Sequence, residues 1–262
     1  AFSGNSLGWF ISSTRNDKPE SGFKNNLVSS GISTTFEQYK DVYINSALSI
    51  TNDNLEVQDS ASSALKKQEG TFTDVALDYG VRYDNRDKAY MPTSGFITGF
   101  NQTIPIYADA PYIRNKYVLS KYNSFGEDIV GSFKLFLSSI HGLGEDVRLS
   151  KRTRIPASRL RGFKPGSIGP KDNLDYVGGN YATTVNFDAN LPKLLPESTK
   201  TDVSLFLDMG NLWGVDYDDS IDESNKIRSS TGVNVNWLSP IGPMSFVLAQ
   251  DITKADTDVT QS

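Results

Sequence analysis

The alternation of apolar and polar residues over long segments is the feature that most constrains this fold. Between Thr71 and Asn85 every second residue from Val75 to Tyr83 is apolar or aromatic, and the residues between them are acidic, small or basic. The same alternation recurs over residues 185–191, 202–209 and 227–237. A period of two predicts β-strands that have one apolar and one polar face. The sequence therefore predicts an all-β protein.

Length and composition exclude several classes of function. The 262 residues fit one large all-β domain, and they include no cysteine and a single histidine. A disulfide framework, a thiolate metal site and a multi-histidine zinc site are therefore excluded. The net charge of −5, with Lys and Arg spread along the chain, does not indicate a nucleic-acid partner. We expect no metal and no cofactor.

Strand length and the placing of the long connections favour a transmembrane β-barrel over a soluble sandwich, which would also alternate. Several patterned segments have about ten residues or more, enough to cross a bilayer when tilted. About eleven strands are expected, with four extended linkers on alternate connections: Asp17–Lys24, Asp53–Gly70, Val147–Tyr176 and Val215–Lys226. Mostly shorter turns lie between them, such as Glu37–Asp41 and Ser239–Gly242. Long loops at one rim and tight turns at the other are typical of outer-membrane barrels.

The strand count predicts an incomplete barrel. Bacterial single-chain barrels close with an even number of strands, and eleven is odd. An open sheet would also leave two unpaired edges, which isolated proteins avoid. We expect residues 1–262 to be part of a larger membrane barrel that has further strands at both ends.

The segment SRLRGFKPGSIGP, residues 158–170, is predicted to be a shaped loop. Its three glycines permit backbone angles that other residues resist, and its prolines fix the path of the chain. The alternation of the following strands places Asp188 and Asp208 on the lumen face, where an unpaired charge is costly. The guanidinium of Arg161, folded inward, can pair with one or both carboxylates. The loop would then be a plug anchored to the wall, and the alternative is a solvated loop arginine.

Several spaced motifs resemble those of the Omp85 superfamily. The family's conserved loop is resembled by Leu160-Arg161-Gly162-Phe163, Ser167-Ile168-Gly169-Pro170 and Gly178-Gly179-Asn180. Three further motifs occur in the family's order: Tyr83-Asp84-Asn85-Arg86-Asp87 with Pro92 and Gly95, Asp208-Met209-Gly210-Asn211-Leu212-Trp213, and Trp237-Leu238-Ser239-Pro240-Ile241-Gly242-Pro243. The resemblance covers roughly residues 70 to 254, and the first seventy residues match by pattern only.

The resemblance implies that residues 1–262 are a partial C-terminal membrane β-barrel (bacterial surface antigen domain), about eleven of sixteen strands, without the periplasmic POTRA repeats. The loop motif Leu160, Arg161, Gly162 and Phe163 would enter the lumen. Asp208, and Asp188 where the family often has glutamate, would be the partners of the loop arginine.

The function implied by the resemblance is the assembly and insertion of β-barrel proteins into the bacterial outer membrane, without chemical catalysis. The implied partners are unfolded outer-membrane proteins, accessory lipoproteins of the assembly machine and outer-membrane lipid.

Three other functions stay open at this point. A related Omp85 transporter, TamA-type or a two-partner secretion pore, would share the loop motif, although the context of residues 168–170 and 178–180 favours the assembly branch. A passive porin would share the alternation but has no need of an arginine loop matched to two lumen carboxylates. An outer-membrane hydrolase needs a nucleophile with a base nearby. We interpret His141 as a solvated rim residue and residues 84–87 as an ion pair that fixes a turn.

Overall fold

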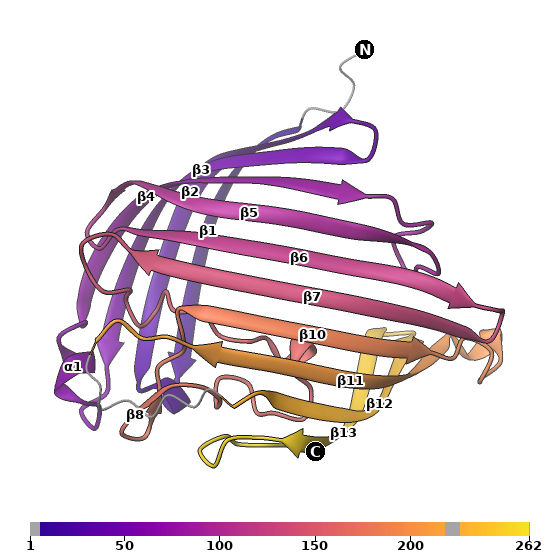
Figure 1. Ribbon diagram of the computed structural model, residues 1–262. Helices are drawn as coiled ribbons and strands as arrows, with labels where there is room; N and C mark the ends of the chain where they lie inside the picture. The colour runs from indigo at the N-terminus through magenta and orange to yellow at the C-terminus, as the bar shows by residue number, and fades with distance from the viewer. Residues whose placement is uncertain (1–5, 218–225, 262) are drawn as a thin grey trace.

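The wall of the molecule is one antiparallel sheet of eleven strands (Figure 1). The structure is a computed structural model and describes residues 6–217 and 226–261. Each strand of the wall pairs with the next wall strand along the chain, and the architecture confirms the all-β prediction. The wall strands are β1 (Ser6–Lys18), β2 (Phe23–Tyr39), β3 (Val42–Val57), β4 (Gly70–Asp84), β5 (Gly95–Ala108), β6 (Tyr112–Phe125), β7 (Ile129–Gly142), β10 (Tyr181–Asn190), β11 (Thr201–Trp213), β12 (Arg228–Ser239) and β13 (Gly242–Thr253).

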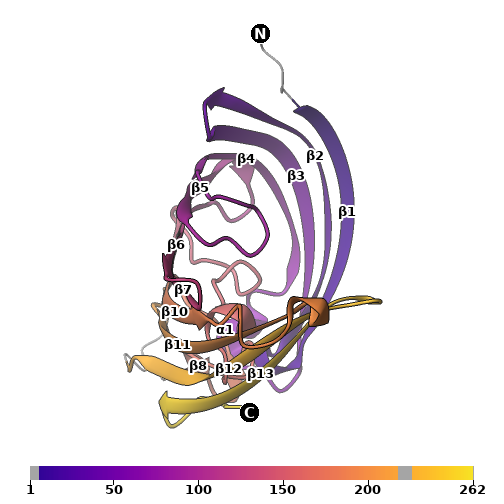
Figure 2. The same ribbon diagram turned by 90° about the vertical axis from the view of Figure 1, so that its right-hand side faces the viewer.

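The sheet curls around a central space, with β1 and β13 at the two ends of the curve (Figure 2). Its strands have 10 to 17 residues, long enough to cross a bilayer when tilted. Within the described residues β1 and β13 each pair on one side only, so the barrel is not closed. No helix in the described part of the chain is long and apolar enough to cross a membrane.

The two faces of the wall follow the predicted alternation. On β11, Asp202, Phe206 and Asp208 are buried on the lumen side, whereas Leu205 and Leu207 are 50% and 36% exposed on the outer side. Outer side chains of a membrane barrel face lipid, so their exposure in the isolated chain is expected. The wall therefore has an apolar exterior and a mostly polar lumen.

The first predicted linker, Asp17–Lys24, is wrong. β1 continues to Lys18 and β2 begins at Phe23, joined only by the 3-10 turn η1 (Pro19–Ser21) and Gly22. Gly22 adopts a left-handed φ of 69°, which closes the turn. Lys24 and Asp17 form an ion pair of 3.4 Å between the paired strand ends. Solvated strand ends are as polar as a linker, so polarity alone could not separate the two.

The other connections define the two rims. One rim carries residues 58–69 with the helix α1 (Ser63–Lys66), the short connection 109–111, residues 143–180, and residues 214–227, of which 218–225 lie outside the described residues. The opposite rim carries the short turns 40–41, 126–128 and 240–241. It also carries two longer connections, 85–94 and 191–200, and the second of these contains the turn η3 (Glu197–Thr199). The rim with the long loops is the extracellular one, and we call the opposite one the turn rim.

The predicted ion pair in the connection 85–94 is confirmed. Arg86 donates through Nε and Nη2 to the two oxygens of Asp84 at 2.8 and 2.9 Å. Asp87 accepts hydrogen bonds from the hydroxyl of Thr93 at 2.7 Å and from the backbone N–H groups of Thr93 and Ser94 at 2.9 and 3.2 Å. The Thr93 hydroxyl, with these N–H groups, lowers the pKa of Asp87 to about 2.

We expect Asp87 to hold this turn above about pH 4 and to release it as the pH falls through about 2. The carboxylate has a lower pKa in the folded state than its unfolded value of about 3.9, so its contribution is complete above that value and is lost on acidification. NMR titration of the Thr93 and Ser94 amide protons should give a midpoint near 2, and Asp87→Asn should abolish it. A midpoint near 3.9 would contradict the turn geometry.

Candidate functional site

The connection between β7 and β10, residues 143–180, folds into the lumen. It contains the 3-10 turn η2 (Ala157–Arg159) and the two-residue strands β8 (Lys171–Asp172) and β9 (Asp175–Tyr176). Its buried side chains Leu160, Phe163 and Ile168 pack against the lumen-facing side chains of Phe136, Ala182 and Leu212 on the wall. We call this connection the arginine loop.

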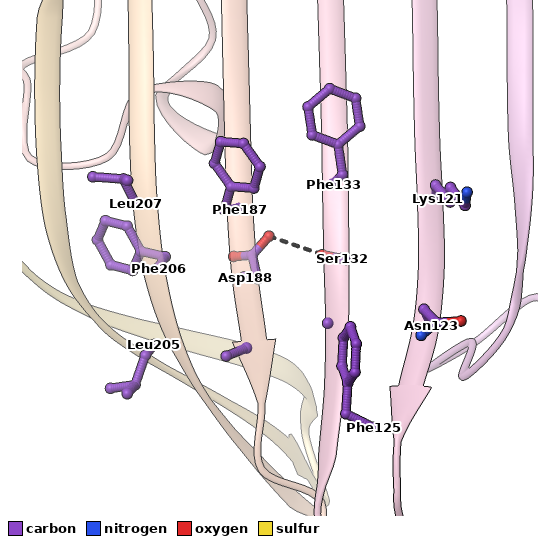
Figure 3. Close-up of a pocket in the computed structure, with 12 residues that line it drawn as sticks. Lys121, Asn123, Phe125, Ser132, Phe133, Phe187, Asp188, Leu205, Phe206 and Leu207 are labelled. Atoms are coloured by element: carbon purple, nitrogen blue, oxygen red, sulfur yellow. Dashed lines mark hydrogen bonds between the residues drawn. The ribbon is translucent and has the colours of Figure 1, made fainter.

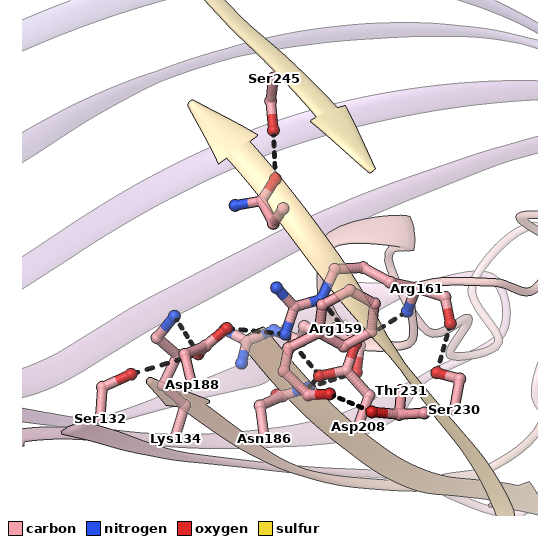
Figure 4. Close-up of polar contacts among 12 residues, drawn as sticks. Ser132, Lys134, Arg159, Arg161, Asn186, Asp188, Asp208, Ser230, Thr231 and Ser245 are labelled. Atoms are coloured by element: carbon pink, nitrogen blue, oxygen red, sulfur yellow. Dashed lines mark hydrogen bonds and ion pairs between the residues drawn. The ribbon is translucent and has the colours of Figure 1, made fainter. Parts of the chain in front are cut away.

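Arg161 is bound to the wall by a fork of hydrogen bonds (Figure 4). Its Nε donates to Oδ2 of Asp208 at 2.7 Å, and its Nη2 donates to Oδ1 of Asp208 at 2.6 Å. The backbone N–H of Arg161 donates to the same carboxylate at 3.0 Å. The Nη2 atom also lies 2.8 Å from Oδ1 of Asp188. The structure thus brings together Arg161 and both carboxylates that the sequence predicted as its partners.

The two carboxylates have further partners on the wall. Lys134 and Ser132 of β7 donate to Oδ2 of Asp188 at 2.9 and 3.2 Å. Asn186 donates to Asp208 at 2.7 Å and to the backbone oxygen of Arg159 at 2.8 Å. Because Asp208 is fully buried, each of its oxygens needs donors from the protein. This network supplies them.

The guanidinium of Arg161 keeps its charge in this site. Burial opposes the charged form, but the hydrogen bonds and negative charges of Asp208 and Asp188 outweigh burial and raise the pKa of Arg161. A buried ion is tolerated only when its geometry and hydrogen bonds are nearly complete. The bidentate contact with Asp208 meets this requirement.

Phe206 provides a second kind of contact with Arg161. The guanidinium carbon lies 3.7 Å from the centre of the Phe206 ring, a cation–π geometry. Gly232 on β12 makes room for this ring, because a Cβ atom there would lie 2.9 Å from the ring and 2.0 Å from the backbone oxygen of Leu248. The alternation over residues 202–209 puts Phe206 on the same face as Asp208, but no role was predicted for it. An aromatic residue at a lumen position was the available signal.

Gly162 allows the loop to approach β12 and β13 closely. Its φ of +85° lies in the left-handed region, and a Cβ atom would lie 3.0 Å from that of Ala249 and 3.4 Å from that of Ser230. The hydroxyl of Ser230 donates to the backbone oxygen of Arg161. The glycine after the arginine is therefore part of the docking geometry.

The segment that follows β13, residues 254–261, also binds the arginine loop, and sequence reasoning missed it. The backbone N–H groups of Lys164 and Gln261 donate to Val259 and Gly162 at 2.8 and 2.9 Å. Arg228 forms a bidentate ion pair with Asp258, both distances being 2.9 Å, and both side chains are fully buried. We call residues 254–261 the return segment. The residue pattern of the return segment did not predict the Arg228–Asp258 ion pair.

A second group of ion pairs anchors the beginning of the arginine loop. Nη2 of Arg148 contacts both oxygens of Asp74 at 2.6 Å, and Lys151 lies 3.0 Å from the same carboxylate. Ser150 donates to the buried Asp53 at 2.7 Å. These residues were also missed, although the four basic residues between positions 148 and 154 and the lumen position of Asp74 were visible in the sequence. The loop is thus tied to both sides of the lumen.

The single histidine lies apart from this network. His141, near the extracellular end of β7, is exposed and packs edge-on against Tyr181, with ring centroids 5.3 Å apart. In the described residues no group of three His, Cys, Asp or Glu side chains is arranged to hold a metal ion.

We expect Arg161→Ala and Asp208→Ala each to lower the free energy of unfolding of the full-length protein by about 3 to 5 kcal/mol, because each leaves a buried charge unpaired. The double variant should lose less than the sum of the two single losses. Urea unfolding in detergent, followed by tryptophan fluorescence, gives the three values. Additive losses would show that the two side chains do not depend on each other.

Loss of the Arg228–Asp258 pair should free the return segment. We expect Asp258→Ala to increase trypsin cleavage after Lys254 in the folded protein, measured by mass spectrometry of the fragments. Asp256→Ala is the matched control, since Asp256 is exposed in the same segment. Equal cleavage in the two variants would mean that the pair does not hold the segment.

The whole chain matches a described protein family. The Omp85 superfamily domain matches residues 2–262.

Curated relatives carry the names of assembly proteins. The chain is 27% identical over 248 residues to the outer membrane protein assembly factor BamA of Neorickettsia risticii, covering 92% of this chain and 33% of the relative. It is 28% identical over 212 residues to BamA of Neisseria meningitidis, covering 67% of this chain and 26% of that relative. The mouse sorting and assembly machinery component 50 homolog is 28% identical over 125 residues, which cover 46% of this chain and 26% of that relative. The chain spans a third or less of the length of these relatives.

Two solved structures show the same fold. BamA from Haemophilus ducreyi lacking POTRA domains 1–3 superposes with a TM-score of 0.84 at 21% identity, over 98% of this chain and 57% of that one. CdiB from Acinetobacter baumannii superposes with a TM-score of 0.60 at 14% identity, over 98% of this chain and 46% of that one.

Proposed function

The chain belongs to the Omp85 superfamily, and from that membership we propose that it works in the assembly and insertion of β-barrel proteins into the bacterial outer membrane. Its place is the outer membrane, as for its bacterial relatives. The proposal concerns the full-length protein, because the chain spans a third or less of those relatives.

One observation carries the proposal beyond the family. Inside the lumen the arginine loop is held by the two hydrogen bonds of Arg161 to Asp208. A relative that matches 92% of this chain is named an outer membrane protein assembly factor. A passive pore has no particular need for an arginine loop matched to two lumen carboxylates. A barrel that has to keep the shape of its wall while neighbouring strands pair and separate does need such an anchored loop.

The proposed action is physical and involves no chemical catalysis. A nascent barrel carries strand edges whose backbone groups cannot stay unpaired in lipid. Pairing with an exposed strand edge of the assembly protein, as in β-augmentation, satisfies those groups during insertion. Arg161 would act on the conformation and stability of the barrel and not on a bond in a client.

The proposed partners follow from this action. Unfolded outer-membrane proteins are the clients, accessory lipoproteins complete the machine, and outer-membrane lipid is the medium that client strands enter. Bilayer thinning beside a short hydrophobic belt would lower the barrier to insertion.

A transporter of the same superfamily, TamA-type or a two-partner secretion pore, is the second candidate. The fold of CdiB supports it, since its barrel superposes over nearly the whole chain. The names of the curated relatives favour assembly, and both solved neighbours are too distant in sequence to decide.

A charge swap tests the proposal. Arg161→Glu should weaken both heat-modifiable folding of the full-length protein and assembly of a client porin, because it places like charges against Asp208 and Asp188. Adding Asp208→Arg should restore part of both, since the pair is re-formed with reversed sign.

Arg159→Glu is the control for the charge swap. Arg159 lies two residues before Arg161, stacks on Phe136 with its guanidinium carbon 4.5 Å from the ring centre, and makes no ion pair in the described residues. If the Arg161→Glu variant folds and assembles the client porin as the wild type does, the loop has no role in assembly. A passive porin would then be the better interpretation of this barrel.

A further inference from the structure

Within the described residues, the outer face of strands β4 to β13 carries a single charged side chain, on the opposite side of the wall from the lumen network. The pairing register assigns each position of the wall strands β4 to β13 to the lumen or to the outer face. Among the outer positions of these strands, all within the described residues, Lys121 is the only Asp, Glu, Lys or Arg. A charge that faces lipid is costly at the midplane and tolerated near the interface, and such residues usually have a function. Lys121 is therefore the charged group available to a ligand on this face.

A trough lies beside Lys121 on β6, β7, β10 and β11, with a volume of about 500 Å³. The register aligns Asn123, Gly131, Ala189 and Leu205 in one row across these strands. Gly131 has no side chain and Ala189 has a single methyl group, so the centre of the row is hollow. The trough is the space that larger side chains at these two positions would fill.

Aromatic side chains form the sides of the trough (Figure 3). Phe133 and Phe187 lie side by side, with ring centroids 5.4 Å apart, on the side away from the turn rim. Phe125 lies on the side of the turn rim, where its ring covers Gly131 closely enough that a Cβ atom there would lie 2.7 Å from it. The apolar floor and sides match a hydrocarbon chain.

Lys121 and Asn123 lie at the β6 end of the trough (Figure 3), where Asn123 pairs with Gly131 and Lys121 pairs with Phe133, two residues farther from the turn rim. Lys121 is exposed, makes no ion pair with any residue in the described ranges, and is four positions before Phe125, the last residue of β6. A lysine side chain at a lipid-facing position near a strand end extends along the wall toward the headgroup region. An ammonium and an amide beside an apolar trough complement a phosphate that carries an acyl chain.

We propose that this trough binds one glycerophospholipid of the leaflet at the turn rim, with an acyl chain along the Gly131–Ala189 row and the phosphate at Lys121. The site requires a membrane barrel but does not depend on the assembly function. Its ligand faces the wall from outside, whereas the arginine loop acts from inside.

Native mass spectrometry of the full-length protein, released from phosphatidylglycerol nanodiscs, measures the retained lipid. We expect Lys121→Gln to reduce the one-lipid adduct about fivefold, the factor that corresponds to one lost Lys–phosphate contact near a membrane surface. Lys121→Arg should keep the adduct. Ala189→Leu, which fills the trough without changing the charge, should reduce it as well.

Arg15→Gln is the matched control, since Arg15 is an exposed outer-face cation of β1 that lies near the extracellular rim, away from the trough. Heat modifiability checks that every variant folds. Equal lipid retention in the wild type, Lys121→Gln and Ala189→Leu, or an equal loss in Arg15→Gln, would overturn the proposal. So would retention of lipid A in place of phosphatidylglycerol from nanodiscs that contain both lipids, with the same dependence on Lys121, because lipid A is not a glycerophospholipid.

Discussion

A buried arginine matched by carboxylates of the wall holds the interior of this barrel together. Removing a guanidinium and a carboxylate from water costs several kcal/mol for each ion, and only nearly complete geometry compensates that cost. Arg161 has such geometry, with a fork on Asp208, a contact with Asp188 and the ring of Phe206 beneath it. A shift of the arginine loop by one residue would leave the fully buried Asp208 without its cation. The loop therefore has one docked position of low free energy.

The wall produces this receptor through simple strand geometry. Asn186 is paired directly opposite Asp208, and Asp188 opposite Phe206, so the two carboxylates are diagonal neighbours on the same face. Diagonal neighbours in an antiparallel pair lie about 7 to 8 Å apart at Cα. That separation leaves room for one planar guanidinium between the two carboxylates. The recognition of Arg161 thus follows from the register of β10 and β11 and from the period of two.

Alternation explains which parts of the structure were predictable. A period of two is visible in a single sequence, and it was enough to place Asp188 and Asp208 in the lumen beside an arginine-bearing loop. The Arg228–Asp258 and Arg148–Asp74 pairs were not predictable, because one partner of each lies in a connection with no period and the chain separations are 30 and 74 residues. The hairpin at Asp17–Lys24 was misread for a related reason, since the ends of strands outside the hydrophobic belt lose their apolar face. Periodicity predicts strands within the membrane, and tertiary contacts determine the rest.

The same strands also connect the two faces of the wall. On β10, Phe187 faces the trough and Asp188 faces Arg161, and on β11 the adjacent residues Leu207 and Asp208 divide in the same way. A slip of one residue in either strand would exchange the two faces, placing a carboxylate in lipid and an apolar side chain against the guanidinium. The arginine loop therefore fixes the register of the lipid-facing surface as well as the lumen. Any ligand that binds the outer face of β10 and β11 rests on strands whose register the lumen ion pairs hold.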